Sequence, residues 1–161
     1  MAFRKDLSYW KKKEIEWAIF LLSTKLISLI ELPPGKCKEY DIKIVTLEWK
    51  EWKEIKYEVK ADRMAHITHN FVIETMCRGK ISWIYTSEAD YIVYHILWKW
   101  RIQKREELIK RIDKLEEKEL VMWWDEDSEW NKTTQMWKIK CKYLPDLFTR
   151  VDVNDPTKEI E

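Results

Sequence analysis

Tyr-Glu-Val-Lys-Ala-Asp, residues Tyr57–Asp62, is the stretch from which the fold is inferred. Its alternation of apolar and charged residues predicts a β-strand, in which every second side chain lies on the same face. Glu58 and Lys60 then point one way, while Ile55 and Val59 point toward a core. A carboxylate and an ammonium side by side form either a surface ion pair or part of a site for a divalent metal and a phosphate group. The neighbouring segments help to decide between a surface ion pair and a metal site.

The residues before this strand predict its partner. Tyr40–Trp49 alternates in the same way, and Trp52–Lys60 continues into the quoted stretch. Two alternating runs separated by a short turn are typical of an antiparallel hairpin. Asp41 is therefore expected on a strand beside Glu58, where two carboxylates could share a metal ion.

The rest of the chain predicts an α+β fold: a mixed central β-sheet flanked by helices. Leu7–Ile30 is expected to be a helix capped by Ser8, and Gln103–Leu120 a second, amphipathic helix. The expected inward face of the first helix consists of Ile15, Ala18, Ile19, Leu22 and Leu26. Further strands are expected over Phe71–Met76, Lys80–Tyr85, Tyr91–Trp98 and Gln135–Tyr143, the third of them buried on both faces.

Length and composition narrow the class of protein. The 161 residues suit a single domain, with a core over about residues 7–148 and a flexible acidic tail over 149–161. A net charge of +1 gives no general attraction to nucleic acid, so any polyanion site must be local. The three cysteines have neither zinc nor disulfide spacing, which favours a reduced, cytoplasmic setting. No apolar run predicts a membrane span, and few glycines with many charges suggest a thermophile.

A series of short motifs resembles the PD-(D/E)XK, or restriction-endonuclease-like, nuclease superfamily, most closely its phage and archaeal-virus members. Each motif is degenerate, so the resemblance rests on their order and spacing. The motifs are Asp41 followed by Glu58-Val59-Lys60-Ala61-Asp62, Asn70-Phe71-Val72-Ile73-Glu74, Gly79-Lys80-Ile81-Ser82 and Thr86-Ser87-Glu88-Ala89-Asp90-Tyr91. The sequence departs from the family pattern at Tyr40, where proline is common, and at His69 and Trp83, where glycine is frequent.

The resemblance implies a restriction-endonuclease-like core and a metal-dependent deoxyribonuclease, acting in the host cytoplasm if the protein is viral. Asp41 and Glu58 would hold Mg²⁺ or Mn²⁺, and either Glu14 or Glu16 of the first helix would complete the site. Lys60 would position or deprotonate the attacking water, or neutralise the charge that develops on the phosphate.

The expected partner is DNA, and the residues expected to contact it are Lys99, Arg101, Lys104, Lys138, Lys140, Lys142 and Asn70. Lysine contacts to phosphates give affinity without sequence preference. The sequence leaves open whether the protein forms a homodimer. It also leaves an alternative function open: a nuclease-like fold that is catalytically inactive and serves in DNA binding or virion assembly.

Overall fold

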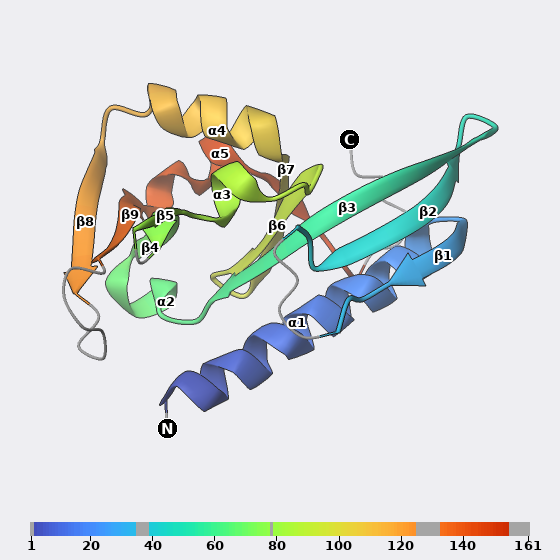
Figure 1. The fold of residues 1–161 in the computed structure, drawn as a ribbon, viewed down its shortest axis with the longest axis horizontal. Coiled ribbons are helices and arrows are strands. Elements are labelled where there is room, and N and C mark those ends of the chain that lie inside the picture. Colours follow the sequence, from blue (N-terminus) through green and yellow to red (C-terminus); the bar gives the residue numbers. More distant parts are fainter. Residues whose placement is uncertain (1, 35–38, 78, 125–132, 155–161) are drawn as a thin grey trace.

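The structure is a computed structural model that describes residues 2–34, 39–77, 79–124 and 133–154 (Figure 1). Its first sheet has the order β1 (Ile27–Glu31), β2 (Ile42–Glu48), β3 (Glu51–Asp62), β6 (Tyr91–Ile96), β7 (Lys99–Lys104) and β10 (Thr149–Val151). Its second sheet has the order β5 (Lys80–Ile81), β4 (Asn70–Cys77), β9 (Thr133–Lys140) and β8 (Lys118–Trp124). The helices are α1 (Ala2–Thr24), α2 (Ala65–Thr68), α3 (Trp83–Thr86), α4 (Arg105–Lys114) and α5 (Leu144–Leu147), the last preceded by a 3₁₀ turn at Cys141–Tyr143.

The α+β class with a mixed sheet is confirmed, but the expectation of one central sheet is wrong. In the first sheet β3 and β6 are parallel and the other neighbours are antiparallel, whereas the second sheet is entirely antiparallel. The expected hairpin of β2 and β3 forms, with Ile42 opposite Tyr57 and a two-residue turn at Trp49 and Lys50. None of the described helices is long and apolar enough to cross a membrane.

The first sheet has a hydrophobic cluster on each face. On one face Trp17, Phe20 and Leu21 of α1 pack with alternate residues of β2 and β3. On the other face β6 packs with the second sheet, α4 and α5. Residues 92–96 of β6 are all buried, which confirms the expectation of a strand covered on both sides.

Strand β3 is longer than β2, and this difference creates an open edge. The ladder between them begins at the pair of Ile42 and Tyr57, so Glu58–Asp62 extends past the start of β2. These same residues remain paired with β6 on the other side. α1 lies along the open edge, where the indole Nε1 of Trp10 donates a hydrogen bond to the carbonyl oxygen of Ala61 at 3.0 Å.

The first helix differs from the expectation in its bounds and in its buried face. It starts at Ala2, so Ser8 lies inside it and is no cap, and it ends at Thr24 because Ile27–Glu31 pairs with β2 as β1. Trp17, Phe20 and Leu21 are buried. The expected inward residues Ile15, Ile19, Leu22 and Leu26 are exposed, and only Ala18 of that set is buried. The large aromatic side chain of Trp17 fills more of the core than the aliphatic row could.

The predicted bounds of the second helix are wrong at both ends. Lys99–Lys104 forms β7 and Lys118–Trp124 forms β8, so α4 covers only Arg105–Lys114. The segment expected as a strand over Lys80–Tyr85 is split into β5 and α3.

The chain beyond residue 148 also differs from the expectation in part. Thr149–Val151, expected within a flexible tail, pairs with β7 as β10, and Val151 is buried in the cluster that contains α1. Residues 155–161 of the expected tail lie outside the described residues.

Candidate active site

Glu58 and Lys60 lie on one face of β3, next to its open edge. Glu58 is only 5% exposed, which is unusual for a carboxylate, and its Oε1 forms an ion pair with Nζ of Lys60. The Lys60 side chain is partly exposed, and its ammonium lies 4.8 Å from the centroid of the Trp83 ring. The pair is therefore closed off by protein on the Glu58 side and reachable from solvent on the Lys60 side.

Asp41 stands directly before β2, opposite Glu58. Its backbone N–H donates to the carbonyl oxygen of Tyr57 at 2.9 Å, which extends the ladder by one bond. Its Oδ2 accepts a hydrogen bond from the backbone N–H of Val59 at 2.8 Å. The carboxylate thus satisfies a backbone donor that the shorter strand β2 leaves unpaired, and it is held beside the Glu58–Lys60 pair.

The structure separates the two glutamates that the sequence left as alternatives. Glu14 lies within electrostatic reach of Asp41 and Lys60 and forms an ion pair with Lys11 at 2.6 Å. Glu16 instead pairs with Lys13 at 2.6 Å and acts on Tyr9 and His95. Of the two, Glu14 is the one that α1 brings toward the site.

Burial and crowding shift the ionisation of this group. Burial raises the pKa of Glu58, and the negative charge of Asp41 raises it further although Lys60 opposes the shift. Burial likewise raises the pKa of Glu14, again with a contribution from Asp41. For Lys60, burial acts to lower the pKa, but the carboxylates of Glu58 and Asp41 outweigh it, so the pKa of Lys60 is raised. Lys60 is accordingly a cation at neutral pH.

Three further residues belong to the surroundings of the site and were not identified from sequence. The hydroxyl of Ser87 donates to the carbonyl oxygen of Glu39 at 2.9 Å and lies 3.5 Å from Oε2 of Glu58. The hydroxyl of Ser82 donates to Oε1 of Glu74, a carboxylate that also acts on Lys60. Both serines lie in the quoted motifs, but the motifs alone do not say which side chain each hydroxyl meets.

The site contains donor atoms of the chemical type that a hard divalent cation binds. Asp41, Glu58 and Glu14 offer carboxylate oxygens from three separate elements, and Mg²⁺ prefers such ligands. Asp41 raises the pKa of both glutamates, so its negative charge lies close to theirs. Among the described residues, however, no three carboxylate, histidine or cysteine side chains are close enough together to hold a metal as they stand. Binding requires Glu58 to turn away from Lys60, and Glu14 from Lys11.

The lysines expected to contact DNA from the last long strand are not free cations. Lys138 of β9 pairs with Glu119 of β8 at 2.8 Å. Lys140 and Lys142 both approach Glu117, at 3.6 and 3.1 Å. Asn70 lies opposite Lys140, but its side-chain amide donates to the carbonyl oxygen of Thr68 at 2.7 Å. These exposed pairs reduce the positive potential of the surface, because each lysine has a glutamate beside it.

Exchanging the charges in this surface is expected to change DNA affinity in opposite directions. Replacing Lys138, Lys140 and Lys142 with glutamate should weaken DNA binding and flatten its salt dependence, since each phosphate contact contributes roughly −0.9 to the slope of log K against log salt. Replacing Glu117 and Glu119 with glutamine should strengthen binding, because the lysines lose their competing partners. The measurement is a titration of a labelled duplex at several salt concentrations.

Lys50→Glu is the matched control, because Lys50 is exposed at the far tip of the β2–β3 hairpin. It changes the net charge without touching β8 or β9. If the triple lysine variant keeps the slope of the wild type, these lysines make no phosphate contacts.

The remaining residues expected to contact DNA lie on β7. Lys99 and Lys104 are exposed, while Arg101 is half-buried beside Arg150 of β10. Burial lowers the pKa of Arg101, and its Nε has no hydrogen-bond partner among the described residues. Arg101 is therefore not a surface cation of the kind that phosphates contact.

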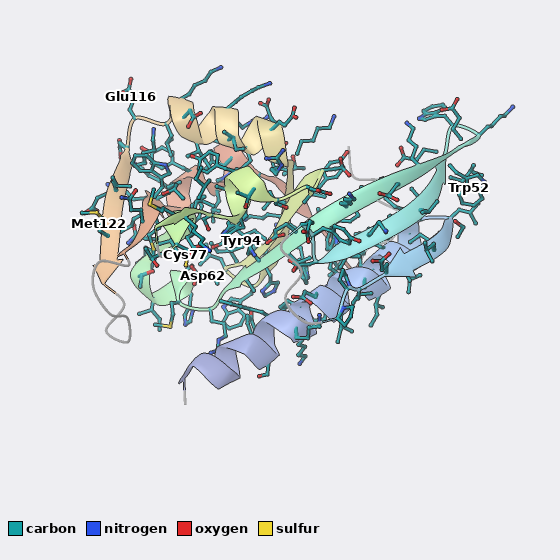
Figure 2. The ribbon with its side chains drawn as sticks, in the orientation of Figure 1. Trp52, Asp62, Cys77, Tyr94, Glu116 and Met122 are labelled. Carbon is teal, nitrogen blue, oxygen red and sulfur yellow. The ribbon has the colours of Figure 1, made fainter. Side chains whose placement is uncertain are left out.

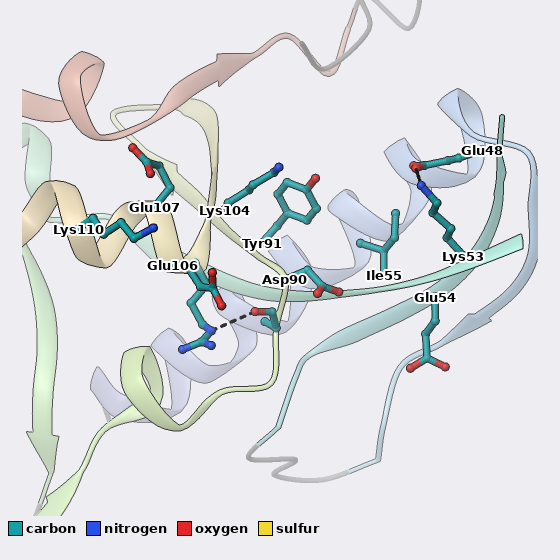
Figure 3. Close-up of a pocket in the computed structure, with 12 residues that line it drawn as sticks. Glu48, Lys53, Glu54, Ile55, Asp90, Tyr91, Lys104, Glu106, Glu107 and Lys110 are labelled. Carbon is teal, nitrogen blue, oxygen red and sulfur yellow. Dashed lines mark hydrogen bonds and ion pairs between the residues drawn. The ribbon is translucent and has the colours of Figure 1, made fainter. Parts of the chain in front are cut away.

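Lys104 lines a depression of about 540 Å³ between β3, the start of β6 and α4 (Figure 3). Its charged lining is mixed: Lys53, Lys104, Arg105 and Lys110 with Glu48, Glu54, Asp90, Glu106 and Glu107. The lining contains none of Asp41, Glu58 and Lys60. With more acidic than basic groups, this depression does not favour a phosphate backbone.

Two comparisons with known proteins gave no match. No protein-family model matches the sequence, and no curated protein matches it significantly.

Proposed function

We propose that the protein is a divalent-metal-dependent deoxyribonuclease that hydrolyses phosphodiester bonds of DNA in the cytoplasm, built on a restriction-endonuclease-like core. The observation that carries the proposal is the group at the open edge of β3. There Asp41 lies opposite Glu58, and Glu58 pairs with Lys60. A buried carboxylate with a second carboxylate and a lysine beside it could hold a metal ion and a phosphate group, which hydrolysis of a phosphodiester needs.

Asp41, Glu58 and Glu14 are the residues that would hold Mg²⁺ or Mn²⁺. A divalent ion supplies a bound water of lowered pKa and positive charge for the phosphoryl oxygens. Glu58 is oriented by Ser87 and by Lys60, and Asp41 by the N–H of Val59. The backbone thus holds Asp41 and Glu58 near each other, and Glu58 would exchange Lys60 for the ion by turning its side chain.

The raised pKa of Lys60 favours one of the roles that the sequence left open. Its pKa is raised by the surrounding carboxylates, so it carries its proton at neutral pH. A protonated lysine cannot remove a proton from water, but it can stabilise the negative charge that builds on the phosphate in the transition state. We therefore assign Lys60 the role of an electrostatic stabiliser.

The test is cleavage of supercoiled plasmid DNA by purified protein with millimolar Mg²⁺ or Mn²⁺, against the same reaction with EDTA. Nicked or linear product only in the presence of metal is expected. The Asp41→Asn variant, prepared in parallel, controls for contaminating nucleases. Equal cleavage by wild type and variant, or no cleavage by either, would contradict the proposal.

A second candidate function is an inactive nuclease-like module for DNA binding or assembly. It is favoured by the exposed row Ile15, Ile19, Leu22 and Leu26, which offers a partner an apolar surface on and just past α1. The plasmid assay separates the two candidates, because an assembly module would show no metal-dependent cleavage.

A further inference from the structure

Two β-hairpins of the first sheet end in turns that present a tryptophan to solvent. In the β2–β3 turn Trp49 and Lys50 have φ of 52° and 70°, and in the β6–β7 turn Leu97 and Trp98 have φ of 51° and 62°. Two-residue turns of this kind favour Asn and Gly, because bulky residues are strained at positive φ. Trp49 is 95% exposed and Trp98 67% exposed, so no core contact explains their placement. Strain held at a surface position points to a function.

The surroundings of Trp98 are aromatic and basic. The ring of His66, on α2, lies 5.4 Å from the Trp98 ring between centroids and tilted by 45°. Lys99 follows Trp98 and is exposed, and Arg63 is exposed just before α2 with its guanidinium over the ring of Tyr9. The neighbouring carboxylate of Asp62 accepts hydrogen bonds from the backbone N–H groups of residues 64 and 65.

Trp98 lies at the same end of the sheet as the candidate active site. β6 runs parallel to β3 with Tyr94 opposite Lys60 and Ile96 opposite Asp62. Trp98 stands beside Leu97 in the two-residue turn after Ile96, so it lies about three residues beyond Lys60 along the strands, roughly 10 Å at ~3.3 Å per residue. A single DNA strand could therefore reach from Trp98 to the candidate active site within a few nucleotides.

Trp49 differs from Trp98 both in its position in the sheet and in the charge of its surroundings. It lies at the opposite end of the sheet, where Figure 2 shows Trp52 near the outer tip of the β2–β3 hairpin and Asp62 at the other end of β3. Its charged neighbours Glu48, Glu51, Lys50 and Lys53 are balanced in sign. The tip at Trp49 therefore has the same turn geometry as the tip at Trp98 without the basic surroundings.

We propose that Trp98, with His66 and the flanking cations Arg63 and Lys99, stacks on an unpaired nucleobase, and that the preferred substrate is DNA with single-stranded nucleotides at a branch, flap or end. The assignment to a substrate rests on the proposed nuclease function. Aromatic side chains bind unpaired bases through their ring faces, and neighbouring cations contact the backbone. A continuous duplex keeps its bases stacked inside and offers no such face.

The test measures binding without cleavage. Anisotropy of a fluorescein-labelled 20-nucleotide thymidine strand, and of a 20-base-pair duplex, is titrated with protein in EDTA. Trp98→Ala should lower affinity for the single strand about 5- to 100-fold, because stacking contributes ~1–3 kcal/mol per base. Affinity for the duplex should stay within twofold. Trp98→Phe should restore most of the single-strand affinity, since phenylalanine also offers a ring face.

Trp49→Ala is the matched control and should bind both probes as the wild type does. Equal single-strand affinities of Trp98→Ala and Trp49→Ala would overturn the inference. So would no binding of the single strand by wild type, or an equal loss for both probes, which would indicate a phosphate contact or a protein interface. A wild-type protein that binds the single strand through Trp98 but cleaves nothing with Mg²⁺ would contradict the nuclease proposal and leave the stacking site standing.

Discussion

Lys60→Ala is expected to abolish metal-dependent DNA cleavage while sparing the fold and DNA binding. The Lys60 ammonium forms an ion pair with Glu58, and its raised pKa keeps it charged. Loss of a group that stabilises transition-state charge typically costs about 10²–10³-fold in rate. The measurement is the single-turnover rate of cleavage at saturating protein, which separates chemistry from binding.

Two further variants, Lys60→Arg and Lys56→Ala, test whether the loss of cleavage is specific to the Lys60 ammonium. Arginine keeps the charge but not the compact geometry, so partial activity is expected. Lys56 lies two residues before Glu58 on the same face of β3 but pairs with Glu88 at 2.8 Å and not with Glu58, so its loss should leave the rate nearly unchanged. A Lys60→Ala protein that cleaves within a few-fold of wild type would show that Lys60 has only a structural role.

Asp41→Asn and Glu58→Gln are expected to remove the stabilisation of the protein by Mg²⁺. A ligand that binds only the folded state stabilises it by roughly 2.7 kcal/mol at 100 times its Kd. For a chain of this size that corresponds to a rise in Tm of about 5–10 °C. Melting curves with and without millimolar Mg²⁺ should show this rise for the wild type and not for either variant.

The two variants should differ in Tm without metal. Asparagine can still accept the hydrogen bond from Val59, and it relieves the repulsion with Glu14 and Glu58, so Asp41→Asn should stay within about 1 kcal/mol of wild type. Glu58→Gln leaves the Lys60 ammonium without its partner and should lose about 1–3 kcal/mol. If the Tm of Asp41→Asn still rises with Mg²⁺ as far as that of the wild type, Asp41 is not a ligand.

The hairpin and the buried strand were predictable from sequence because their patterns depend on local alternation. Ile55, Tyr57 and Val59 are buried as the period of two predicts, and the register that sets Asp41 opposite Glu58 follows from a two-residue turn. The burial of Glu58 could not be predicted in this way. It depends on packing from α3 and the second sheet, which lie far away in the sequence.

Other sequence-based predictions were wrong for identifiable physical reasons. The turn at Leu97 and Trp98 has none of the Gly or Asn residues that mark such turns, so the sequence predicts a strand through Trp98 and does not predict β7. The two apolar faces of α1 have similar hydrophobicity, and only the tertiary fit of Trp17 against Tyr57 and Trp100 determines which one is buried. The pairing of the lysines of β9 with Glu117 and Glu119 depends on the register of β8, which the sequence did not reveal.

The position of Glu58 and Lys60 on β3 also determines how fast the site can rearrange. β3 is held by β6 along this segment, and the sheet has a packed core on each face, so its backbone has little freedom to move. The exchange of Glu58 from its lysine to a metal ion must then occur by side-chain rotation alone. Glu58 is only 5% exposed, so this rotation is expected to be slower than the picosecond to nanosecond rotamer changes of exposed side chains. If the site binds a metal ion as proposed, binding would then require a side-chain rotation but no movement of the backbone.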